Sequence, residues 1–149
     1  MTRTILRISF ENKDIETFEG YELPHLTVHT HDDDLTGHEK ALITALTDAV
    51  VSVYGDWARP HVGIRLIGLP AGRTGTGGEV DTVPAPAVDF GIRTDALNRP
   101  DITEILKRLT QAVTDAIAAT LGEHHREQTS VSFTPTTSAT TIAEASHPA

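Results

Sequence analysis

The sequence contains no cysteine, which excludes disulfide bonds, thiolate nucleophiles and cysteine-ligated zinc. Aromatic residues make up only 5% of the chain. No apolar run approaches the roughly 20 residues that a membrane-spanning helix needs, so no membrane partner is expected. Lysine and arginine number 12 against 21 acidic residues, the formal net charge is −9, and no basic cluster stands out. A nucleic-acid partner is therefore not expected either.

The 149 residues are about enough for one domain, and 38% hydrophobic with 22% charged residues is a globular composition. Residues 1–16 show neither the apolar segment nor the cleavage pattern of a secretory signal peptide. We therefore expect a cytoplasmic protein.

Alternation of apolar and polar residues predicts four strands, at residues 25–30, 61–68, 87–94 and 129–133. Apolar residues spaced three and four apart predict two helices, each ending at a glycine, Gly55 or Gly122. The apolar positions of these helices are Leu42, Leu46, Ala49, Val50 and Val53 in the first, and Ile102, Ile105, Leu106, Leu109, Val113, Ile117 and Leu121 in the second.

Short polar motifs are expected to connect these elements. Thr36 with Glu39, and Asp101 with Glu104, have the spacing of helix-starting capping boxes. Residues 32–34 are three aspartates and predict an acidic turn. The glycine-rich residues 71–79 predict a turn or a tight two-stranded ribbon.

The segments 24–80 and 86–135 are related halves, because LTDAV at residues 46–50 matches VTDAI at residues 113–117. Each half predicts a β-α-β unit, and together they predict an α+β fold with a four-stranded sheet and both helices on one face. We assign residues 24–135 to this domain. Residues 1–23 are predicted to form an extension with a strand near residues 4–10, and residues 136–149 a flexible or docking tail.

The first unit resembles the tautomerase superfamily, which contains 4-oxalocrotonate tautomerase, malonate semialdehyde decarboxylase and macrophage migration inhibitory factor. The resemblance rests on Pro24 at the strand start, LTGHEKALITALTDAV, HVGIRLIGLP and the string GTGGE at residues 75–79. It extends to about residue 133, and the two-unit length is similar to that of trimer-forming members. The resemblance implies a homotrimeric isomerase or lyase that moves a proton on a small oxo-acid or enol substrate without a cofactor.

The base of this family is an amino-terminal proline, and the resemblance places Pro24 at its position. Pro24 follows Leu23, so its nitrogen is an amide without a basic lone pair, and the family mechanism would require removal of residues 1–23. At the positions of two substrate-binding arginines of the family stand residues 32–34 and Gly63. Arg65, on the same strand face as Gly63, is the expected substitute.

If residues 1–23 are retained, His25 or His29 is the best candidate base, since imidazole titrates near neutral pH. The candidates for binding a substrate carboxylate are Arg65, Arg73 and Arg93, because guanidinium pairs with carboxylate through two hydrogen bonds. Their alternative role is intersubunit ion pairing, with Asp89 or Glu79 as the partner.

His25, His29 and His31, followed by three aspartates, have the side chains of a zinc site. Residues four and six apart on a strand are separated by roughly 13–20 Å, so one ion cannot contact them all. We therefore predict no metal.

The alternative to an enzyme is a tautomerase-fold binding or assembly protein that has lost the catalytic amine.

Overall fold

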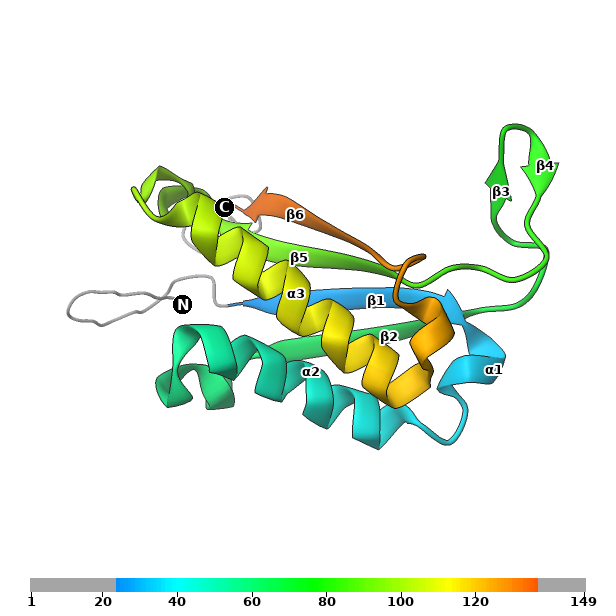
Figure 1. The fold of residues 1–149 in the computed structure, drawn as a ribbon, viewed down its shortest axis with the longest axis horizontal. Coiled ribbons are helices and arrows are strands. Elements are labelled where there is room, and N and C mark those ends of the chain that lie inside the picture. Colours follow the sequence, from blue (N-terminus) through cyan, green and yellow to red (C-terminus); the bar gives the residue numbers. More distant parts are fainter. Residues whose placement is uncertain (1–23, 137–149) are drawn as a thin grey trace, which may run out of the picture.

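The computed structural model describes residues 24–136, where four strands form one sheet and two long helices cover one of its faces (Figure 1). The strands are β1 (His25–His31), β2 (Gly63–Leu69), β5 (Ala87–Arg93) and β6 (Ser130–Thr136), and the long helices are α2 (Glu39–Tyr54) and α3 (Ile102–Leu121). The predicted α+β fold with both helices on one face is confirmed. The strand predicted at residues 4–10 and residues 137–149 of the predicted tail lie outside the described residues.

The strand order across the sheet is β2-β1-β5-β6. β1 runs parallel to β2, β5 runs parallel to β6, and the central pair β1 and β5 is antiparallel. Each parallel pair is one β-α-β unit, so the two predicted units meet along β1 and β5. As a result, the start of β1 lies beside the end of β5.

Shorter elements connect these strands and helices: α1 (Asp32–Leu35), η1 (Asp56–His61), η2 (Thr94–Asn98), η3 (Glu123–His125), β3 (Gly75–Thr76) and β4 (Glu79–Val80). β3 and β4 form the ribbon that was one of the two alternatives for residues 71–79, and it stands away from the sheet (Figure 1). None of the helices within residues 24–136 is long and apolar enough to cross a membrane.

The core lies between the sheet and the two helices. Inward-facing residues of β1 and β5 alternate with outward-facing polar ones, as the period-two pattern predicted. Phe90 is fully buried and packs on Phe133 of the neighbouring strand, with ring centroids 5.4 Å apart. The largest fully buried side chains are Phe90, Leu26, Leu42, Leu46, Leu109, Ile117, Val28, Val50, Val88 and Val113.

Both long helices end at the predicted glycines. Gly55 has φ +109° and Gly122 has φ +130°, values that side chains with a Cβ rarely adopt. The amide of each glycine still donates to the carbonyl four residues earlier, Val51 or Ala118. The chain therefore leaves each helix sharply and enters a short 3₁₀ turn.

The capping box predicted for α2 is wrong. Residues 32–34 form the short helix α1 rather than an open turn, and the Thr36 hydroxyl donates to the Asp32 carbonyl at 3.1 Å. Thr36 therefore closes α1, and α2 begins only at Glu39, whose Oε1 accepts from the Gly37 amide at 2.9 Å.

The second capping pair is also wrong. Asp101 precedes α3, but its carboxylate makes no capping bond. It accepts instead from Arg99 Nε and Nη2, both at 2.9 Å, and these bonds hold the pKa of Asp101 below its usual range. The Asp101 carboxylate, which the sequence pattern predicted as a cap of α3, is thus bound by the guanidinium of Arg99.

Candidate active site on the outer sheet face

The sheet face opposite the helices is polar, as the alternation predicted, and the strand register arranges it in rows. One row holds Gly63, His25, Gly91 and Thr134, in the order β2-β1-β5-β6. The next row holds Arg65, Thr27, Asp89 and Ser132. These two rows place an imidazole and a guanidinium on the same face.

Pro24 lies immediately before β1, and its carbonyl accepts from the Gly63 amide at 3.1 Å. This bond fixes the start of β1 to β2. The Pro24 nitrogen itself is joined to Leu23 by a peptide bond. His25 is the next residue, and its exposed side chain lies on the outer face.

His25 lies between two glycines, one on each neighbouring strand. On the β5 side its ring covers Gly91, where an added Cβ would lie 2.5 Å from His25 Cε1 and 2.8 Å from Nε2. On the β2 side an added Cβ at Gly63 would meet only His25 Cβ, at 3.6 Å. The imidazole is therefore displaced toward β5, and the backbone of Gly63 is exposed.

Arg65 follows Gly63 on the same side of β2 and is exposed. Strand geometry separates the Cα atoms of Arg65 and His25 by about 8 Å, which a guanidinium and an imidazole can bridge through a small molecule. Within residues 24–136 no acidic side chain forms an ion pair with Arg65. Its guanidinium is thus available for a carboxylate.

The other two predicted arginines have different positions. Arg93 ends β5 and, because β5 is antiparallel to β1, lies at the same end of the sheet as His25; its Nη2 is 2.7 Å from Asp95 Oδ2. Arg73 follows the far end of β2, beyond the position of His29 along the sheet. The fold therefore brings His25, Arg65 and Arg93 to one end and leaves His29 nearer the other.

Asp89, one of the two carboxylates considered as an arginine partner, is bound within its own chain. It accepts from the Thr134 hydroxyl at 2.6 Å. The suggested intersubunit pairs with Asp89 or Glu79 stay predictions, since only one chain is described.

Asp33 and Asp34, just after β1, each lie near a different histidine. His31 Nε2 lies 3.9 Å from Asp33 Oδ2, and His125 Nε2 lies 3.1 Å from Asp34 Oδ2. In the described part of the chain no three histidine, aspartate or glutamate side chains converge as a metal site would require. The side chains of residues 24–136 therefore do not by themselves form a coordination sphere for a metal ion.

His125 is a residue that the sequence reasoning missed. It belongs to η3, its side chain is only 4% exposed, and its ring stacks against His124 with centroids 4.0 Å apart. Its approach to Asp34 is not aligned as a hydrogen bond, and neither ring nitrogen has a hydrogen-bond partner in residues 24–136. The only sequence signal was the histidine pair at residues 124 and 125, shortly after the helix-ending Gly122.

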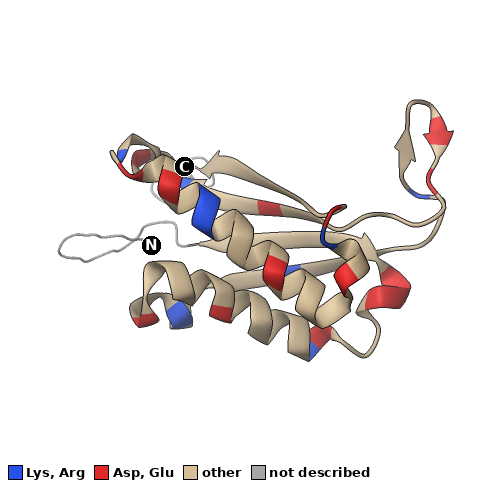
Figure 2. Ribbon diagram, viewed as in Figure 1, with Lys and Arg blue, Asp and Glu red and all other residues tan. Residues whose placement is uncertain are grey.

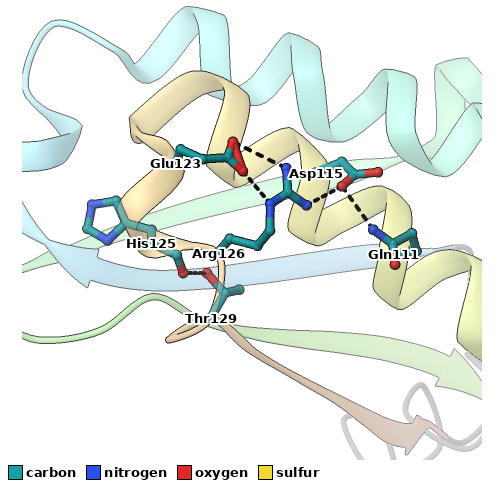
Figure 3. Close-up of polar contacts among 6 residues, drawn as sticks. All are labelled: Gln111, Asp115, Glu123, His125, Arg126 and Thr129. Atoms are coloured by element: carbon teal, nitrogen blue, oxygen red, sulfur yellow. Dashed lines mark hydrogen bonds and ion pairs between the residues drawn. The ribbon is translucent and has the colours of Figure 1, made fainter.

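Beside His125, Arg126 anchors η3 to α3 (Figure 3). Its guanidinium bonds to Glu123 and to Asp115, and Gln111 Nε2 donates to the same Asp115 oxygen at 2.9 Å. The hydrogen bonds from Arg126 lower the pKa of both Asp115 and Glu123. This network lies on the helix layer, away from the outer sheet face.

The wider charge distribution matches the excess of acidic residues. Figure 2 shows acidic positions on α1, α2, α3 and the ribbon, with basic positions scattered singly among them. In this view no basic stripe crosses the molecule. The arginines near His25 are therefore local features of the sheet face.

No protein-family model matches the chain, and no curated protein matches its sequence. Solved structures do match. One is the F6 fused 4-OT wild-type asymmetric trimer, at 24% identity and TM-score 0.65, covering 79% of this chain and 98% of that one. Native fused 4-OT is 26% identical with TM-score 0.61, covering 76% and 87% of the two chains.

A third match is Pt0534 inactivated by 2-oxo-3-pentynoate, at 18% identity and TM-score 0.62, covering 79% of this chain and 98% of that one. Each match covers more than three quarters of this chain, and two of them include nearly the whole length of the neighbour. The chain therefore has the fold of the tautomerase superfamily.

Proposed function

We propose that this chain is a tautomerase-like isomerase that moves a proton on a small oxo acid or its enol. In this proposal His25 is the base and Arg65 binds the substrate carboxylate. The observation that carries the proposal is the position of the exposed His25 imidazole directly after Pro24, on the same outer face as Arg65. Fused 4-OT and Pt0534 share the fold, which supports the reaction class.

The proton transfer needs no cofactor. The neutral imidazole takes the hydroxyl proton of the enol, and the resulting enolate takes a proton at its carbon from the imidazolium, which gives the keto acid. One proton leaves oxygen and one arrives at carbon, so the atoms balance. A guanidinium at Arg65 holds the carboxylate and stabilises the enolate charge.

His25 is a better candidate than Pro24 because the Pro24 nitrogen is an amide in this chain. Imidazole titrates near neutral pH and both accepts and returns a proton there. His29 is as far as His25 from Arg65, because each lies two positions along β1 from Thr27, the partner of Arg65. It is further than His25 from Arg93 at the end of β5. Arg73 and Arg93 are the alternative carboxylate ligands.

2-Oxo-3-pentynoate, which inactivated Pt0534, provides the test. An imidazole nitrogen adds to the triple bond, a C–N bond forms and the adjacent carbon takes up a proton, so the protein gains the whole mass of the reagent. We expect one equivalent on the tryptic peptide that contains His25, and none there in His25→Gln. His38→Gln, which alters an exposed histidine between α1 and α2, is expected to be labelled like wild type.

Three labelling outcomes would contradict the role of His25. Equal labelling of wild type and His25→Gln, a label on a different residue, or no reaction at all would each remove His25 as the reactive base. A label on His29 would transfer the role to the other candidate of β1.

We also propose that the chain assembles as a homotrimer in the cytoplasm. The fused 4-OT neighbour is a trimer. The ribbon and the segment after it carry two exposed apolar side chains, Val80 at 71% and Val83 at 52%. Exposed valines on an arm that stands away from the sheet favour a protein partner, and a second copy is the simplest one.

A further inference from the structure

The two glycines beside His25 differ in what covers them. The His25 ring lies on Gly91, which is buried, whereas Gly63 is exposed and has only His25 Cβ near the place where its own Cβ would be. Both residues share one row with His25. Gly91 lies inside β5 and Gly63 is the first residue of β2. A glycine in a strand has no side chain of its own, so another group can approach its backbone closely.

We propose that the His25 imidazole is positioned by packing against the backbone of Gly91, and that the exposed backbone of Gly63 lines the substrate subsite. This inference rests on the proposed function. A planar enol acid lies flat on the exposed Gly63 backbone, with its reacting carbon beside the imidazole. Its carboxylate points along β2 toward Arg65, about 6.6 Å further along the strand.

The strand geometry favours this direction. β2 is one of the two edge strands of the four-stranded sheet, so no further strand of the described chain pairs with it on the side away from β1. The ribbon follows the opposite end of β2, away from Gly63 (Figure 1). A side chain at position 63 would fill the space that the substrate needs, whereas one at position 91 would displace the base.

The two alanine variants therefore have different kinetic effects on the enol-to-keto conversion of phenylpyruvate. Gly63→Ala adds a methyl group at ordinary contact distance from His25, so the base stays in place, and KM is expected to rise roughly tenfold with kcat little changed. Gly91→Ala places a methyl group 2.5 Å from the ring. Its kcat is expected to fall roughly 100-fold and the pH profile of kcat to shift, because the base is misplaced.

His25→Gln separates failure of this inference from failure of the proposed function. An unchanged KM in Gly63→Ala, together with a large loss of activity in His25→Gln, would overturn the Gly63 subsite while the function stands. If His25→Gln keeps the kcat and KM of wild type, both the Gly63 subsite and the proposed function are overturned.

Folding of each variant is checked separately from its kinetics, by comparing its far-UV circular dichroism and thermal unfolding with those of wild type. If Gly91→Ala does not fold, the imidazole NMR signals of His25 in Gly63→Ala and wild type still test the subsite. Added phenylpyruvate is expected to shift these signals in wild type at concentrations that leave Gly63→Ala unchanged, and equal shifts in the two proteins would contradict the inference.

Discussion

At the scale of single residues, the pair formed by His125 and Asp34 joins η3, after α3, to α1, after β1. Replacing Asp34 by alanine removes the carboxylate that lies 3.1 Å from the buried His125 imidazole. We expect Asp34→Ala to lower the free energy of unfolding by about 1–3 kcal/mol, as measured by urea denaturation. Asp33→Ala is the matched control, because the Asp33 side chain is 87% exposed, and equal effects of both variants would contradict this role.

Arg126 gives a prediction about pH. Its hydrogen bonds lower the pKa of Asp115 and Glu123 from ordinary values of 3.8 and 4.5. A lowered folded-state pKa contributes stability that is present above the ordinary value and is lost as pH falls through the folded-state value. The difference in unfolding free energy between wild type and Arg126→Met is therefore expected to be largest near neutral pH, to shrink as pH falls below these ordinary values, and to close only below the lowered folded-state values.

The control for Arg126 is Arg108→Met, which removes an exposed arginine of α3, the helix that carries Asp115. Urea denaturation of the three proteins across the pH range is the measurement. A difference between wild type and Arg126→Met that stays constant with pH would show that the ion pairs do not carry the effect.

At the scale of elements, the glycine after α2 determines how the chain turns from helix to strand. Gly55 has φ +109° and ψ 166°, a region that only glycine populates readily. Gly55→Ala is expected to destabilise the fold by about 1–3 kcal/mol in thermal or urea unfolding. Gly63→Ala, at a glycine in β2 without positive φ, is the control and is expected to keep wild-type stability; the reverse order would contradict the assignment.

The elements also show what the sequence could predict. Period-two alternation located β1, β2 and β5 to within two residues, and glycines located both helix ends, because these signals are local. The capping boxes failed because Thr36 and Asp101 each had a competing partner, the Asp32 carbonyl and the Arg99 guanidinium. Such competition depends on geometry that spacing alone does not contain.

In the candidate site too, some features could be predicted from local sequence patterns and others could not. The alternation placed His25 and Arg65 on one face from sequence alone. The position of Gly91 under the His25 ring, and the approach of His125 to Asp34, depend on pairing between segments far apart in the chain. No local pattern encodes those two contacts, so only the fold could reveal them.

At the scale of the whole molecule, the exposed ribbon predicts assembly. Light scattering coupled to size-exclusion chromatography is expected to give about 48 kDa, three times the 16.1 kDa chain mass. Val80→Asp puts a charge on the most exposed large apolar residue in the described chain and is expected to shift the population toward monomer. Ile43→Asp, on the exposed face of α2, is the control; a wild type of 16 kDa would contradict the trimer.

The most direct measurement is the kcat/KM for phenylpyruvate tautomerisation by the chain whose intact mass shows that residues 1–23 are present, in wild type and in His25→Gln. We expect activity in the intact chain and a loss of roughly 10²–10⁴-fold in the variant, because the general base is removed. Activity that appears only after residues 1–23 are removed would assign the base to the Pro24 amine. An inactive wild type would favour a binding or assembly role on the tautomerase fold.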